Sequence, residues 1–172
     1  MKNIIKCITL VMVLMTSSFS EEVVSKTKLD TIKKQYGKKA QTRFILWNKM
    51  IEESKSLKTL DKLIVVNNFF NQVQYLKDIK LWKQENYSST TEEFLSTGAG
   101  DSEDYAKAKK EALIKLGIKK ENLVLEWKTL KKEQTLYNKY DKKHCILKYY
   151  HEENSTPIIL DNIDKRLRLQ KS

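Results

Sequence analysis

The residue types needed for acyl-transfer chemistry occur in the order serine, histidine, aspartate, at Ser102, His144 and Asp161. Ser102 follows Gly98-Ala99-Gly100-Asp101, a stretch typical of a tight loop that ends at a helix N-cap. A nucleophile in the first turn of a helix lies near unpaired N–H groups and the positive end of the helix dipole. A histidine would take its proton, and a carboxylate would fix the imidazole tautomer and stabilise its charged form. The pattern therefore indicates a nucleophilic site.

The same residues also have a structural interpretation, which the sequence leaves open. Asp101, Glu103 and Asp104 fall in a first helical turn, where acidic side chains are common because they complement the dipole. An isolated histidine such as His144 is more often structural than catalytic. Cys145 offers no second nucleophile, because neighbouring residues of a strand point to opposite faces. We expect it to face the core as a small buried hydrophobe.

The helices that would position these residues come first in the chain. Apolar residues recur at three- and four-residue steps over 59–76, which predicts a helix with core-facing Leu60, Leu63, Ile64, Phe70, Val73 and Leu76. Capping boxes that begin at Ser89 or Thr90 predict a short helix over 91–96. A longer helix is expected over 102–116, ended by the glycine that follows it.

Beyond residue 117 the apolar period changes to two. This alternation predicts three short strands, over 123–127, 144–150 and 158–161. The lysine-rich stretch 128–142 is expected to be an exposed connection. Helices followed by a small antiparallel sheet make an α+β fold. Two neighbouring strands would then present His144 and Asp161 side by side, with the helix start packed across them.

The first twenty residues have the features of a secretory signal. Lys2 and Lys6 give a basic start, residues 7–15 are almost wholly apolar, and Ser18-Phe19-Ser20 offers small residues for cleavage. The apolar run is too short to span a bilayer, which disfavours the alternative of an uncleaved membrane anchor. We therefore expect a signal peptide at 1–20, a single mature domain at 21–172, and no stable membrane insertion after cleavage.

Charge and cysteine content narrow the class of protein. The net charge is +11, but the lysines are scattered rather than clustered, as on a solvated surface. Nucleic-acid binding would need a basic face interleaved with aromatic residues, and export disfavours it further. Nucleic-acid binding is therefore not expected. After signal cleavage only Cys145 remains, so no intramolecular disulfide can form and the domain must depend on its hydrophobic core.

A resemblance to a known family adds to this interpretation. The stretches that carry it lie between about residue 40 and residue 163: they are Val66-Asn67-Asn68-Phe69-Phe70-Asn71, Glu93-Phe94-Leu95, the block from Gly98 to Ala106, His144 and Ile159-Leu160-Asp161-Asn162. They resemble the bacterial transglutaminase-like cysteine peptidases, a family that includes the LapG-type periplasmic proteases. In that family the block reads Gly-Asp-Cys-Glu-Asp. The resemblance implies a papain-like/transglutaminase-like fold, with the triad positions at Ser102, His144 and Asp161.

The resemblance also implies a cofactor and partners. Family members need calcium, here expected at Asp101 and Glu103, with Asp104 joining. A bound Ca²⁺ would offset the carboxylates that flank the nucleophile and would fix the loop. Such proteases act in the periplasm, cut a large surface adhesin and so release cells from a biofilm, and an inner-membrane receptor for cyclic di-GMP sequesters them. These implications set the expected cofactor, substrate and receptor.

Three departures from the family pattern shape the predicted function. Ser102 replaces the cysteine, Tyr87-Ser88 stands where a tryptophan is usual, and the sequence ends at Ser172, where relatives continue, so we expect a shortened C-terminal part. A helix dipole that yields a thiolate cannot yield an alkoxide, so Ser102 would depend wholly on His144. We therefore predict a catalytically impaired peptidase. The alternatives are a non-catalytic binding module for receptor or adhesin, an active Ser-His-Asp peptidase, and a transferase or amidase on the same scaffold.

Overall fold

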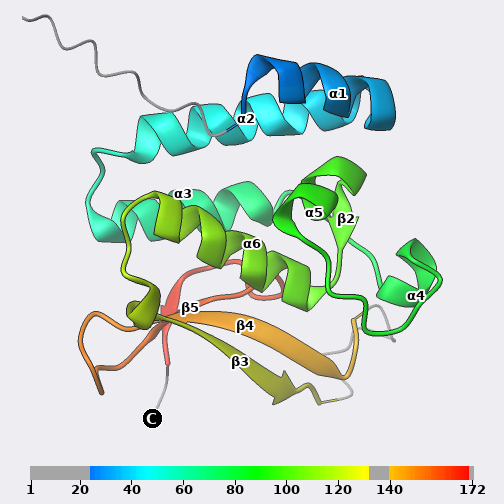
Figure 1. The fold of residues 1–172 in the computed structure, drawn as a ribbon. Helices are drawn as coiled ribbons and strands as arrows, with labels where there is room; N and C mark the ends of the chain where they lie inside the picture. Colours follow the sequence, from blue (N-terminus) through cyan, green and yellow to red (C-terminus); the bar gives the residue numbers. More distant parts are fainter. Residues whose placement is uncertain (1–23, 132–139, 171–172) are drawn as a thin grey trace, which may run out of the picture.

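The computed structural model describes residues 24–131 and 140–170 and shows helices stacked on one face of a small sheet (Figure 1). The predicted signal peptide at 1–20 and most of the predicted connection at 128–142 lie outside the described residues. Within these two described ranges, no helix combines the length and the apolar character needed to cross a membrane.

Three long helices open the described chain. α1 spans Lys26–Tyr36, α2 spans Lys38–Ser54 and α3 spans Thr59–Phe70. α1 and α2 pack on each other and lie farthest from the sheet, while α3 lies beside the central helix α6, Ser102–Lys115 (Figure 1). The short helices α4, Asp78–Leu81, and α5, Thr91–Thr97, connect this layer to the loop that precedes α6.

The main sheet is antiparallel, with strand order β3-β4-β5-β6. Its strands are β3, Leu123–Thr129, β4, Lys143–Tyr149, β5, Ile158–Leu160, and β6, Arg168–Leu169, and a 3₁₀ turn at Lys120–Asn122 leads into β3. On β4, Cys145, Leu147 and Tyr149 belong to the core, which α6 shares. Because side chains alternate along a strand, His144 lies on the opposite face.

The α+β fold predicted from the sequence is confirmed, and several element boundaries are close to those expected. α6 begins at Ser102, and Gly117 has a φ of 84° after its end. The N–H groups of Gly117 and Ile118 donate to the carbonyls of Ile114 and Leu113, which is a Schellman arrangement. Strands at 123–129, 143–149 and 158–160 follow the predicted alternation.

The predicted helix over 59–76 is too long. α3 ends at Phe70, and Gln74–Tyr75 instead form β1, which pairs in parallel with β2, Ala99–Gly100. This pairing ties the chain after α3 to the loop before α6, so a tertiary contact overrides the helical period. Leu60 and Ile64 also face outward, with 53% and 39% of their surface exposed, whereas Leu63 and Phe70 are buried.

Candidate active site

Side chains packed against two glycines shape the loop that leads to Ser102. Gly98 ends α5 in the left-handed conformation, with φ of 69°. Beneath it, the Arg43 guanidinium donates to the carbonyls of Leu95 and Ser96, at 2.5 and 2.6 Å. A Cβ on Gly98 would lie 2.6 Å from Arg43 Cζ, and one on Gly100 would lie 2.5 Å from an Asp104 carboxylate oxygen. The left-handed backbone therefore favours glycine at position 98, and the packing of Asp104 and Phe94 favours it at position 100.

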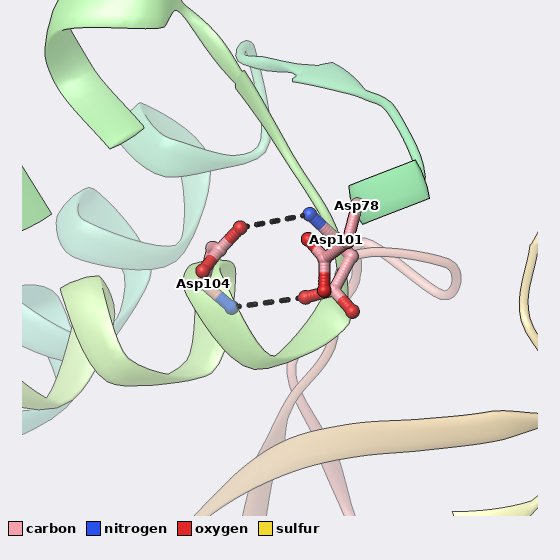
Figure 2. A group of neighbouring side chains, drawn as sticks. All are labelled: Asp78, Asp101 and Asp104. Carbon is pink, nitrogen blue, oxygen red and sulfur yellow. Dashed lines mark hydrogen bonds between the residues drawn. The ribbon is translucent and has the colours of Figure 1, made fainter. Parts of the chain in front are cut away.

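A capping box fixes the first turn of α6. The Oδ1 of Asp101 accepts from the N–H groups of Glu103 and Asp104, at 2.9 and 3.4 Å, and Asp104 Oδ2 accepts from the Asp101 N–H at 3.1 Å (Figure 2). Asp101 is therefore the N-cap that the sequence indicated. Ser102 is the first residue of the helix and is 1% exposed.

The start of α6 meets β4 beside His144. The Oγ of Ser102 accepts a hydrogen bond of 3.0 Å from the backbone N–H of Cys145. β5 pairs with β4 only over Leu147–Tyr149, so this part of the β4 edge is not used by β5. The Cys145 side chain is buried in the core, as predicted, and burial raises the pKa of its thiol to about 12.

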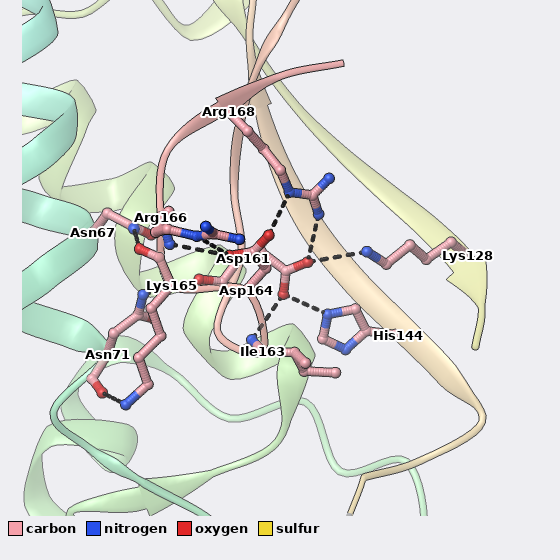
Figure 3. Close-up of polar contacts among 10 residues, drawn as sticks. All are labelled: Asn67, Asn71, Lys128, His144, Asp161, Ile163, Asp164, Lys165, Arg166 and Arg168. Carbon is pink, nitrogen blue, oxygen red and sulfur yellow. Dashed lines mark hydrogen bonds and ion pairs between the residues drawn. The ribbon is translucent and has the colours of Figure 1, made fainter. Parts of the chain in front are cut away.

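His144 and Asp161 form the pair that the sequence suggested. The Nε2 of His144 lies 2.8 Å from Asp161 Oδ1, and Asp161 follows directly after β5 (Figure 3). Burial alone would raise the pKa of Asp161. The pKa is nevertheless held well below its usual range by the hydrogen bond and charge of His144, by the Ile163 N–H and by the charge of Lys128. Asp161 is therefore an ionised partner of the imidazole.

The triad positions are only partly connected: His144 contacts Asp161, and Ser102 contacts the backbone of Cys145, next to His144. Among the hydrogen bonds of the described residues, none joins Ser102 to His144, and none involves the Nδ1 of His144. Since Nε2 faces Asp161, Nδ1 is the ring nitrogen left for a nucleophile. Asp161 is also contacted by side chains that the sequence did not single out as site residues. Asn71 donates to the backbone carbonyl of Asp161 at 2.9 Å, and Lys128 and Arg168 contact the Asp161 carboxylate.

Three carboxylates gather at the start of α6. Ligand oxygens of Asp78, Asp101 and Asp104 lie within 4.8 Å of one another (Figure 2). Asp78 begins α4, and no local sequence signal pointed to it, because only folding brings it to this loop. The predicted ligand Glu103 points elsewhere: it accepts from the Ser88 hydroxyl at 2.9 Å and lies 3.9 Å from Lys107 Nζ.

The electrostatics of this cluster suit a cation. Burial and then the charge of Asp104 raise the pKa of Asp78 to about 6 and that of Asp101 to about 7. Burial also raises the pKa of Asp104. The Oδ1 of Asp78 is buried without a hydrogen-bond partner among the described residues. A hard divalent cation would bind this oxygen and offset the repulsion among the three carboxylates. The residues present therefore fit Ca²⁺.

A surface cavity of about 670 Å³ lies beside the carboxylate cluster, and Ser102, His144 and Asp161 do not line it. Asp78, Asp101 and Glu103 line one side, and Trp127 and Lys128 of β3 line another. Trp127 is 53% exposed. Tyr87, at the position where the resemblance leads one to expect a tryptophan, packs on Trp82 with tilted rings whose centroids lie 4.5 Å apart. The cavity thus offers an apolar surface beside charged groups.

Comparison with known proteins identifies the family and confirms the fold. Residues 31–172 match the sequence profile of the bacterial transglutaminase-like cysteine proteinases, and the chain belongs to this family. Solved structures of Legionella pneumophila LapG are similar: one has 27% identity and a TM-score of 0.68, covering 85% of this chain and 77% of that chain. A calcium-bound form of that protein has 28% identity and the same TM-score, covering 84% and 76%. No curated protein matched.

Proposed function

We propose that this chain is an exported, calcium-binding member of the family whose peptidase activity is impaired by Ser102. The observation that carries the proposal is the position of Ser102, which begins α6 and hydrogen-bonds the residue next to His144. The pair of His144 and Asp161 supplies a base and its orienting carboxylate. The weak element is the hydroxyl, which the helix dipole cannot convert to an anion as it would a thiol.

A calcium ion at Asp78, Asp101 and Asp104 is part of this proposal. The raised pKa values of Asp78 and Asp101, the unpartnered Asp78 oxygen and the calcium-bound form of a similar protein support it. When bound, the ion would supply positive charge beside the helix start and hold the loop in place. Asp101 and Asp104 also keep their capping bonds, so the loop keeps its shape through the protein's own contacts.

The proposed substrate is a segment of an exported protein. Two partners fit the family. One is a large surface adhesin, which a protease acting in the periplasm would cut, and the other is an inner-membrane receptor for cyclic di-GMP. The cavity beside Trp127 is where a peptide segment would lie, between the carboxylate cluster and β3. If turnover is absent, the same surface serves a non-catalytic binding module.

One observation favours the second candidate, an active serine peptidase. The Cys145 N–H already donates to Ser102 Oγ, and a hydrogen bond donated to a hydroxyl oxygen favours its loss of a proton. His144 would then take the hydroxyl proton while Asp161 stabilises the imidazolium.

One experiment separates these functions. The mature chain, Ser102→Cys and Ser102→Ala are each incubated with Ca²⁺ and the N-terminal region of a large repeat-rich adhesin encoded near the gene. We expect discrete cleavage by Ser102→Cys and little or none by the serine form. Strong cleavage by the serine form that Ser102→Ala loses establishes the serine peptidase instead. If neither form cuts while the adhesin fragment still binds, the chain is a binding module.

A further inference from the structure

Asp161 is held by four donors, two on each carboxylate oxygen. Its Oδ1 faces His144 Nε2 at 2.8 Å and accepts from the Ile163 N–H at 2.9 Å. Its Oδ2 accepts from Lys128 Nζ at 3.0 Å and from Arg168 Nη2 at 3.2 Å (Figure 3). One oxygen is thus committed to the imidazole, and the other is committed to two cations.

Strand register places these cations on the same face as His144. Lys128 of β3 lies directly opposite His144 of β4. Arg168 of β6 lies opposite Ile159, which is two residues before Asp161. Since side chains alternate along a strand, Lys128, His144, Asp161 and Arg168 share one face. β3 and β6 are the two edge strands of the sheet, so the cations reach the carboxylate from opposite edges.

Arg168 also forms an ion pair with a second carboxylate. Its Nε lies 3.2 Å from an oxygen of Asp164, while its Nη2 contacts Asp161. Arg168 thus connects the two carboxylates of the turn that follows β5. The Asp161 side chain is 2% exposed, against 29% for Lys128 and 38% for Arg168, so the carboxylate is buried and its cations reach solvent.

We propose that Lys128 and Arg168 are positioning residues that set the tautomer of His144 through Asp161. By holding Oδ2 they prevent rotation of the carboxylate and keep Oδ1 on the imidazole. Asp161 then retains the proton of His144 on Nε2, which leaves Nδ1 as the proton acceptor for residue 102. The inference rests on the proposed function, since it assigns His144 the role of base.

The tautomer can be measured without any activity. In ¹⁵N-labelled mature chain at alkaline pH, two-bond ¹H–¹⁵N spectra distinguish a ring protonated on Nε2 from one protonated on Nδ1. His144 and His151 are the two histidines, so His151→Gln assigns the signals. The test variants are Lys128→Met, Arg168→Met and the double variant. Lys148→Met is the matched control, because Lys148 lies on the same face but pairs with Glu126 instead.

We expect His144 to be protonated on Nε2 in the unaltered chain and in Lys148→Met. In the double variant the ratio of tautomers should shift toward Nδ1–H by about fivefold, the effect of weakening one hydrogen bond. Lys128→Arg and Arg168→Lys should restore the original ratio. A folded double variant with the original ratio overturns the proposal. If the double variant does not fold, Lys128→Met decides by the same criterion, because that side chain is partly exposed on an edge strand.

Kinetics separate this inference from the proposed function. In a Ser102→Cys background that cleaves, Arg168→Met should lower kcat by about tenfold with little change in KM, because Arg168 does not line the cavity. Arg168→Lys should recover most of the loss. Unchanged kcat in a folded Arg168→Met variant overturns the positioning role. If Ser102→Cys does not cleave at all, the proposed function fails, and the tautomer ratio still decides the inference.

Discussion

The Oγ of Ser102 accepts a hydrogen bond of 3.0 Å from the backbone N–H of Cys145, the residue next to His144. This bond joins the start of α6 to β4 at the point where β5 no longer pairs with it. Both residues are buried, at 1% exposure each, so water does not readily replace either partner. The side chain at position 102 therefore contributes to the stability of the fold as well as to the proposed chemistry of the site.

The first prediction concerns this bond. Ser102→Ala should lower the free energy of unfolding by about 1–3 kcal/mol, because it leaves the buried N–H of Cys145 without an acceptor. Denaturant unfolding followed by circular dichroism measures the change. Ser96→Ala is a suitable control, since the Ser96 Oγ has no hydrogen-bond partner among the described residues. Equal stability of Ser102→Ala and the unaltered chain would show that the bond contributes nothing.

The second prediction concerns calcium. Adding CaCl₂ at about 100 times its Kd should stabilise the mature chain by about 2.7 kcal/mol, seen as a rise in Tm relative to EGTA. Asp78→Asn should remove most of this rise, because it neutralises the ligand that only folding brings to the cluster. Glu103→Gln should remove less, since its carboxylate bonds Ser88.

The control for the calcium experiment is Glu92→Gln. Glu92 is half exposed and pairs with Lys28, away from the cluster. It should keep the full calcium response. The absence of any calcium-dependent rise in Tm at millimolar concentrations would exclude the proposed site, and an equal loss in Glu92→Gln would attribute the effect to net charge alone.

How far the sequence predicts this molecule depends on how local each signal is. α6 and β4 were predicted because their signals lie within them: a capping aspartate, a terminal glycine and an alternation of apolar residues. The two-residue strands β1, β2 and β6 have no such pattern, and tertiary pairing alone creates them.

The candidate site divides in the same way. The order and spacing of Ser102, His144 and Asp161 were visible in the sequence, and the structure brings His144 and Asp161 into contact. Asp78 and Arg168 were not predicted as site residues. Each is an ordinary charged residue along the chain and gains its role from a neighbour that is distant in sequence. Such roles are not encoded by local spacing.

The third prediction concerns export. If residues 1–20 are a cleaved signal, protein recovered from the periplasm should begin at or near Glu21, as read by N-terminal sequencing or intact mass. Placing an arginine within the apolar run, as in Leu10→Arg, should block export and leave precursor in the cytoplasm, whereas Leu10→Ile should not. Recovery of an intact N-terminus from the membrane fraction would favour the uncleaved anchor.

Lys109 leads to the last prediction. It lies two turns after Ser102 on α6, is 1% exposed, and its ammonium lies 5.8 Å from the centre of the Tyr105 ring. Among the described residues, no hydrogen bond or salt bridge involves its side chain. Burial lowers its pKa to about 7, although the charge of Asp161 acts in the opposite direction. A buried cation held in this way costs stability whenever it is charged.

The sign of the pH effect follows from proton binding. In the unfolded chain this lysine has a pKa of 10.5, so between about pH 7 and 10.5 the unfolded state binds a proton that the native state lacks. The contribution of Lys109 therefore makes the free energy of unfolding rise with pH across that window. Below pH 7 both states are protonated, and the full penalty of the buried charge remains.

Lys109→Met should therefore stabilise the protein by about 1–4 kcal/mol at pH 6 and by much less near pH 10. Denaturant unfolding of both proteins at pH 6, 8 and 10, at constant calcium, measures this difference. Lys110→Met, at the partly exposed neighbouring position, should give a small change that does not vary with pH. A stability difference between Lys109→Met and the unaltered chain that is the same at all three pH values would show that Lys109 does not titrate in this range.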